Sequence, residues 1–136
     1  MKAVIDTNVV LSGLFFKGVP REIYLAWTNK AFVGILTSSI LNEYRRAAFA
    51  FLGKPSGDPE VDEALQLIVV NSLLIDAPPL PKPICRDTDD DKFIACALHG
   101  RAQCIVSGDK DLRVLKDRIA VDVMSPREFL ERIGGT

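Results

Sequence analysis

The chain has few residues that carry nucleophilic or redox chemistry. Among its 136 residues it contains one histidine, His99, and three cysteines, Cys85, Cys96 and Cys104. A single histidine excludes acid–base mechanisms that need two, and leaves any Ser-His or Cys-His nucleophile dependent on one side chain. The cysteines form no C-x-x-C pair and lie in or beside apolar runs, so we expect buried, reduced thiols and no zinc site.

Long apolar runs and phosphate-binding glycine motifs are also missing. No apolar stretch approaches 20 residues and no charged segment precedes an apolar run at the N-terminus, so we expect a soluble, cytoplasmic protein without a membrane span. The absence of G-x-x-x-x-G-K-[ST] and G-x-G-x-x-G leaves nucleotide-cofactor chemistry unsupported. The 17 basic and 18 acidic residues nearly cancel. Any contact with nucleic acid must therefore be local.

The hydrophobic pattern predicts alternating strands and helices. The length fits one domain spanning residues 1–136, with a core that needs no disulfides. Strand-like runs alternate with helical periodicity, which predicts an α/β fold with a mostly parallel sheet covered on both sides. The expected strands are residues 3–5, 32–37, 73–76, 103–107 and 120–123. The expected helices are residues 9–16, 20–30, one from Ser38 or Ser39 to about 51, one after the 53–59 turn, 88–99, one to about Lys116, and 125–134.

Two acids lie near the ends of the first two strands. Asp6 follows the first strand, at the edge of the sheet where ligands bind in open α/β folds. Helix N-capping is the alternative role for Asp6. Glu43 lies in the first turns of the helix after the second strand, where a solvated carboxylate paired with Arg45 or Arg46 is the alternative.

Residues 86–100 hold a further group of acids. Thr88 and Asp91 have the spacing of a helix capping box, and Gly100 would end that helix after His99. Helical spacing also places Asp91 on one stripe with Ile94, Ala95 and Leu98, so this carboxylate heads the buried face. For His99, which is three residues from Cys96, we expect interaction with the carbonyls at its helix end and no catalytic pairing.

Asp109 follows the fourth strand much as Asp6 follows the first. A role as turn or cap residue is the alternative for Asp109 and Asp111. Gathered at one sheet edge, Asp6, Glu43, Asp91 and Asp109 would repel one another unless a cation neutralised them. Oxygen ligands without matching His or Cys favour Mg²⁺ or Mn²⁺, which also acidifies bound water. Phosphodiester hydrolysis is the reaction class that this predicts.

Four segments resemble the acidic motifs of the PIN-domain family: VIDTNV (4–9), SILNEY (39–44), DDKFIACA (90–97) and SGDKDL (107–112). Their order and spacing cover essentially the whole chain, and the resemblance is to stand-alone bacterial and archaeal members similar to VapC toxins. It implies a three-layer α/β/α fold with sheet order 3-2-1-4-5 and Mg²⁺- or Mn²⁺-dependent cleavage of RNA. It also implies a homodimer, and an antitoxin protein that covers the acidic pocket.

The resemblance assigns roles residue by residue. Asp6, Glu43, Asp91 and Asp109 match the metal-binding carboxylates, and Asn8 and Ser107 match polar positions that orient ligands or water. Ser107 stands where threonine is commoner in the family. Asp90 could exchange roles with Asp91, and Asp111 could assist. The cations flanking the motifs are candidates for phosphate contacts, with a solvated surface charge as the alternative for each: Arg45, Arg46, Lys92 and Lys110.

Two other functions remain open from the sequence. A PIN fold could bind metal without turnover and serve as a protein- or RNA-binding module. A phosphoacceptor signalling domain also gathers acids and Mg²⁺ at strand ends, but Asp76 is its one candidate acceptor at the third strand and the lysine expected after the fifth strand is missing.

Overall fold

A five-stranded, all-parallel sheet organises the chain, in the order β3-β2-β1-β4-β5. The computed structural model describes residues 1–54, 57–115 and 117–134. The strands are β1 (Lys2–Ile5), β2 (Val33–Leu36), β3 (Ser72–Leu74), β4 (Cys104–Val106) and β5 (Asp122–Met124). The predicted α/β architecture and strand order are confirmed.

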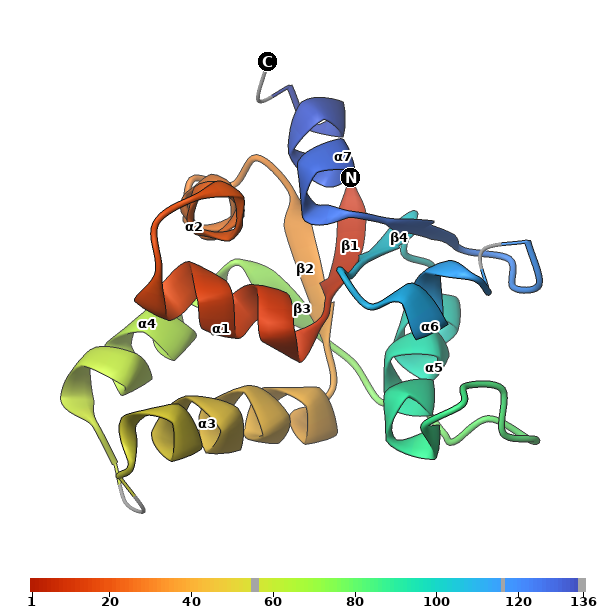
Figure 1. The fold of residues 1–136 in the computed structure, drawn as a ribbon, viewed down its shortest axis with the longest axis horizontal. Coiled ribbons are helices and arrows are strands. Elements are labelled where there is room, and N and C mark those ends of the chain that lie inside the picture. Colours follow the sequence, from red (N-terminus) through yellow and green to blue (C-terminus); the bar gives the residue numbers. More distant parts are fainter. Residues whose placement is uncertain (55–56, 116, 135–136) are drawn as a thin grey trace.

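Helices cover both faces of this sheet (Figure 1). They are α1 (Thr7–Phe15), α2 (Val19–Thr28), α3 (Ser38–Leu52), α4 (Pro59–Val70), α5 (Asp91–His99), α6 (Lys110–Arg113) and α7 (Pro126–Arg132). The first four lie on one side, with α7 packed against α2, whereas α5 lies on the other side against β1, β2 and β4. A three-layer α/β/α sandwich results.

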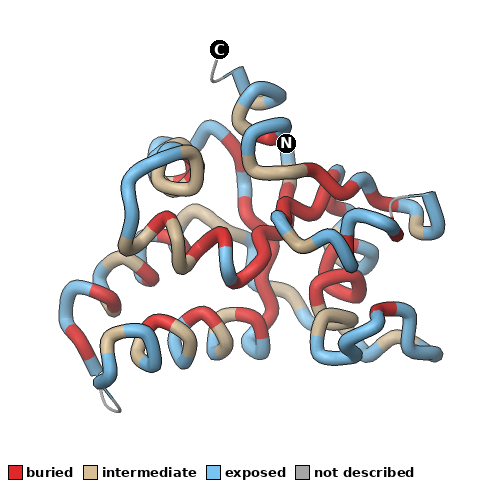
Figure 2. Tube along the Cα trace, viewed as in Figure 1, coloured by how far each residue is buried: buried red, intermediate tan, exposed pale blue. Residues whose placement is uncertain are grey.

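The central strand and one face of α5 form the middle of the core (Figure 2). Ala3, Val4 and Ile5 of β1 are at most 1% exposed, as a strand covered on both faces requires. Trp27 packs directly on Gly34 of β2, where any Cβ would stand 2.2 Å from the indole ring. The glycine thus admits a large aromatic side chain between α2 and the sheet.

The pairing of β1 with β4 brings two motif residues together. Ile5 lies opposite Val106 in the parallel register. Asp6 and Ser107, the next residue on each strand, therefore emerge side by side at the carboxyl edge of the sheet. The same edge receives the first turns of α3 and α5, which contact each other.

Several expected boundaries and caps differ from those observed. Thr37, and neither Ser38 nor Ser39, caps α3 by accepting a hydrogen bond from the Ile40 N–H at 3.1 Å. The Thr88–Asp91 capping box does not form, because residues Thr88–Asp90 make a 3₁₀ turn before α5. The predicted end of a short helix near Lys116 lies outside the described residues.

The second capping box of the chain is present as expected. At the start of α7, the Ser125 hydroxyl accepts from the Glu128 N–H, and the Glu128 carboxylate accepts from the Ser125 N–H. Pro126 occupies the first turn, where its missing N–H costs no helical hydrogen bond. Here the signal is local, so the sequence is sufficient to predict it.

The cysteines are buried, as the sequence predicts. Cys85, Cys96 and Cys104 are free and buried. Loss of hydration on burial raises the pKa of the Cys85 and Cys96 thiols to about 12 and that of Cys104 to about 11, so none is an activated nucleophile. Across the described ranges, no helix combines the length and apolar character needed to cross a bilayer.

Candidate active site

Asp6 stands at the centre of the carboxyl edge. It is 6% exposed and occupies the N-cap position of α1, yet its side chain makes no capping hydrogen bond there. The carboxylate instead accepts a hydrogen bond from the Ser107 hydroxyl at 2.8 Å. The N-capping alternative therefore does not explain this buried acid.

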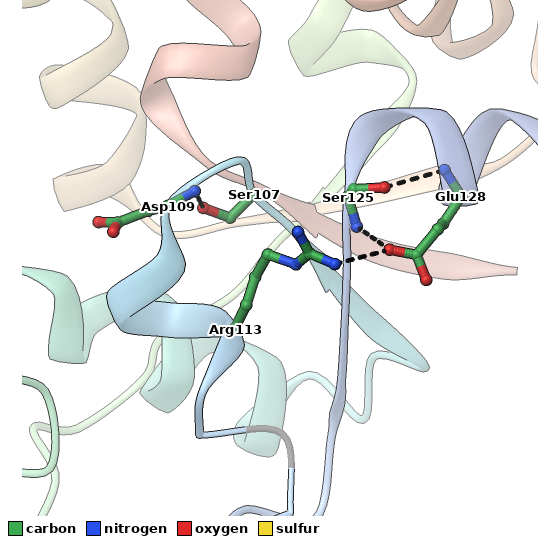
Figure 3. A network of polar contacts seen from close by, with 5 residues as sticks. All are labelled: Ser107, Asp109, Arg113, Ser125 and Glu128. Atoms are coloured by element: carbon green, nitrogen blue, oxygen red, sulfur yellow. Dashed lines mark hydrogen bonds and ion pairs between the residues drawn. The ribbon is translucent and has the colours of Figure 1, made fainter.

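Ser107 links Asp6 to Asp109. The Ser107 side chain is fully buried, and its oxygen also accepts from the Asp109 N–H at 2.9 Å. Figure 3 shows the Asp109 carboxylate directed away from the ion pair between Arg113 and Glu128 that ties α6 to α7. Asp109 accepts from the Asp111 N–H at 2.9 Å and so caps α6.

A shallow pocket opens beside these residues. Its volume is about 400 Å³, and it is lined by Asp6, Asn8, Ser12 and Asp109 together with neighbouring residues of α1, α2 and α7. Asn8 is exposed and lines the same pocket as Asp6 and Asp109. Asp111 is exposed, and its backbone N–H donates the hydrogen bond to Asp109 described above.

Glu43 enters the site from α3 and is held from two sides. Its carboxylate accepts from the Thr7 hydroxyl, next to Asp6, and pairs with the Lys92 ammonium group from α5. The Glu43 and Lys92 side chains are 25% and 24% exposed. The sequence does not predict this ion pair. It suggests Lys92 for phosphate contact, and Arg45 or Arg46 as the partner of Glu43. Arg45 instead faces Asp62 at 3.7 Å.

The two adjacent acids at the head of α5 have different surroundings. Asp91 accepts from the Cys85 N–H at 2.7 Å and from the Ile84 N–H at 3.3 Å, so its carboxylate holds the proline-rich loop. For Asp90, burial first of all, and then the negative charges of Asp6, Asp87, Asp109 and Glu43, raise the pKa to about 6. The charges of four other acids, three of them in the motifs, therefore act on Asp90.

The stripe expected from Asp91 differs in one position. Ile94 and Ala95 are buried, whereas Leu98 is 39% exposed. The buried face of α5 instead runs through Phe93–Ala97. His99 is exposed at the end of this helix, and the Cys96 thiol donates to the Ile35 carbonyl at 3.6 Å, which leaves no catalytic pairing between the two.

Charge is concentrated among the carboxylates. Burial raises the pKa of Asp6, the Ser107 hydrogen bond lowers it, and the charges of Asp109 and Glu43 raise it further. The negative charges of Asp109 and Glu43 thus repel the charged forms of both Asp6 and Asp90. Within the residues that the structure describes, no three His, Cys, Asp or Glu side chains converge closely enough to form a finished metal cage.

The donors nevertheless suit a hard divalent cation. They are carboxylate oxygens with hydroxyl and amide neighbours, as Mg²⁺ and Mn²⁺ prefer, and such ions keep several waters and bind through a few carboxylates. The Lys92 ammonium group shows that the edge already attracts positive charge. Burial and the repulsion between these acids raise the pKa of Asp6 and Asp90, and a cation would offset both effects.

Comparison with known proteins identifies the family. A family model described as PIN domain matches residues 2–111. The chain is also 32% identical over 145 residues to the uncharacterized protein MJ1680 of Methanocaldococcus jannaschii, an alignment that covers 96% of this chain and 90% of that protein.

The chain belongs to the PIN-domain family. PIN domains are generally nucleases that bind nucleic acid and use divalent metal ions. The four acidic motifs of this PIN domain all begin within the matched range, at residues 4, 39, 90 and 107. The strand β5 and the helix α7 follow the matched range and complete one edge of the sheet.

Proposed function

We propose that this PIN domain is a metal-dependent ribonuclease that hydrolyses phosphodiester bonds of RNA at the carboxyl edge of its sheet. One observation carries the proposal: buried Asp6 is linked to Asp109 through Ser107 and lies next to Thr7, which donates to Glu43, so acids from separate elements share one edge. Clustered carboxylates of this kind destabilise the fold unless a bound cation neutralises them, and groups with shifted pKa values are typical of functional sites.

Each residue then has a role in the reaction. Asp6, Glu43 and Asp109 hold the cation, and the acid at the head of α5 completes the set. The charges around Asp90 favour it for that position, whereas the resemblance of motifs favours Asp91. Ser107 orients Asp6, and Asn8 lies in the adjoining pocket where it can position water. When bound, Mg²⁺ or Mn²⁺ supplies a more acidic water and stabilises charge on the phosphate.

Cleavage of RNA by the purified protein tests the proposal. A mixed-sequence single-stranded RNA is incubated with wild type and with Asp6→Asn, in Mn²⁺, in Mg²⁺ and in excess chelator. Asp122→Asn is the matched control, because Asp122 is exposed on β5. We expect metal-dependent cleavage by wild type and the control and none by Asp6→Asn. If folded wild type binds Mn²⁺ but cleaves no RNA, a metal-binding module without turnover replaces the ribonuclease.

The resemblance to VapC-like proteins extends the proposal to biological context. In that role the protein is a cytoplasmic toxin, forms a homodimer, and is inhibited by an antitoxin protein that covers the acidic pocket. Induced expression in a bacterial host should then arrest growth with wild type but not with Asp6→Asn. Normal growth with an active wild-type enzyme would contradict the toxin role and leave the ribonuclease in place.

A further inference from the structure

A second pocket lies between α3, α5 and the proline-rich loop. Its volume is about 440 Å³, within the range of small-molecule sites. The first turn of α3, the loop and the start of α5 each supply part of the wall. Lining residues include Ser39, Pro79, Leu80, Pro83, Thr88 and Asp89.

Two side chains join this pocket to the candidate active site. Lys92 lines the pocket and pairs with Glu43, which in turn accepts from Thr7 beside Asp6. Asp91 also lines the pocket, and its hydrogen bonds to the N–H groups of Ile84 and Cys85 fix the loop against α5. The pocket therefore adjoins the candidate active site, and Asp91 holds the loop that forms part of its wall.

The lining combines apolar surfaces with polar and charged groups, Lys92 among them, and so favours a flat ligand with polar edges. Pro79, Leu80 and Pro83 offer apolar surfaces, whereas Ser39, Thr88 and Asp89 add hydroxyl and carboxylate oxygens. The Asp89 carboxylate repels phosphate but accepts hydrogen bonds from amino groups. A nucleobase matches both features, because proteins recognise unstacked RNA bases by stacking on their faces and hydrogen bonding to their edges, and a carboxylate accepts from an exocyclic amino group.

We propose that this pocket binds one nucleobase of the RNA strand, next to the phosphate that lies at the acids, and that it prefers an amino-bearing base over uracil. The identity of the strand rests on the proposed ribonuclease function. The pocket would give the enzyme a sequence preference beside the cleavage site, although the carboxylates themselves contact only the backbone.

A binding experiment without metal or phosphate tests the pocket directly. Adenosine, cytidine, guanosine and uridine are titrated into the metal-free protein, and backbone amide shifts are followed by NMR. Ser39→Phe fills the pocket mouth, and Ser38→Phe is the matched control, since Ser38 is an exposed neighbour outside the pocket lining. We expect saturable shifts around Ser39, Asp89 and Lys92, weakest for uridine and weakened at least about tenfold by Ser39→Phe only.

The outcomes separate this inference from the ribonuclease proposal. No saturable shift with any nucleoside, or equal binding by the two phenylalanine variants, overturns the base pocket. A cleavage assay on mixed RNA in Mn²⁺ gives the second readout: Ser39→Phe and Asp89→Asn should change which bases flank the cut, while Ser38→Phe should not. Cleavage with an unchanged base preference overturns the pocket alone, whereas nucleoside binding without cleavage overturns only the ribonuclease.

Discussion

Asp90 and Asp91 are adjacent in sequence but are stabilised by different partners. Asp91 accepts hydrogen bonds from the N–H groups of Ile84 and Cys85, while Asp90 lies near four other acids. The helical stripe with Ile94 and Ala95 draws attention to Asp91, because sequence periodicity reports which side of a helix is buried. It does not report which buried or half-buried acid lies near the other acids, since that depends on the turn before the helix.

The pH dependence of stability should distinguish Asp90 from its neighbours. In the folded, metal-free protein the pKa of Asp90 is raised to about 6 from its ordinary value of 3.8. The folded state therefore holds this proton more tightly than the unfolded state, so stability falls as pH rises through that window. In chelator, Asp90→Asn should be more stable than wild type at pH 7, and the difference should vanish near pH 4. Urea denaturation of both proteins from pH 4 to pH 7 measures this difference in unfolding free energy. A difference that does not change with pH would contradict the raised pKa of Asp90.

Ser107 makes a second prediction at the residue scale. Its buried hydroxyl donates to Asp6 and accepts from the Asp109 N–H. Ser107→Ala removes both of these hydrogen bonds and should cost about 1–3 kcal/mol of unfolding free energy, with weaker binding of Mn²⁺. Ser107→Thr keeps the hydroxyl and should lose less. Denaturation in chelator and Mn²⁺ calorimetry give the two readouts, and an equal loss in both variants would assign the effect to packing around β4.

Among the helix caps, the sequence predicts a cap where one local motif is present but cannot choose where several neighbouring residues could serve. The Ser125–Glu128 capping box formed as expected because both partners lie within one turn. Thr37, Ser38 and Ser39 all suit a cap, and the sequence does not rank them. The end of β2 selects Thr37, because the strand leaves this residue in extended backbone geometry with its side chain directed at the Ile40 N–H.

The capping box at Thr88 is absent because Thr88–Asp90 form a 3₁₀ turn, and the Asp91 carboxylate accepts hydrogen bonds from the preceding loop instead. Sequence spacing shows that Asp91 lies three residues after Thr88, but it cannot show that the chain folds back to present the N–H groups of Ile84 and Cys85. The same limit applies to the contact between Lys92 and Glu43, which joins α5 to α3. Contacts between elements need the tertiary arrangement.

Removal of Asp91 should therefore release the loop more than it disturbs the helix. In Asp91→Ala the N–H groups of Ile84 and Cys85 lose their acceptor, so hydrogen exchange at these two amides should accelerate while the α5 interior, such as Cys96, stays protected. Asp89→Ala is the control, since Asp89 lies in the same segment and is exposed. Uniformly faster exchange throughout α5 would instead make Asp91 a helix-stabilising residue.

For the molecule as a whole, the parallel sheet explains why much of the site was predictable. Parallel strands end at a common edge, so residues directly after β1 and β4 must meet there, as Asp6 and Ser107 do. The sequence could not show how strongly Asp6 is buried, because burial depends on all three layers. That burial is the source of a tension between folding and function: the fold holds charge that it would be more stable without.

This tension predicts opposite effects of Asp6→Asn with and without metal. Burial and the charges of Asp109 and Glu43 raise the pKa of Asp6, so removal of its charge should leave the protein in chelator at least as stable as wild type. Saturating Mn²⁺ should reverse the order, because binding at 100 times Kd stabilises the folded state by about 2.7 kcal/mol. Thermal melts of wild type, Asp6→Asn and Asp122→Asn at several Mn²⁺ concentrations measure the crossing. Asp122→Asn should follow wild type, and an equal rise in Tm for all three proteins would place the metal away from Asp6.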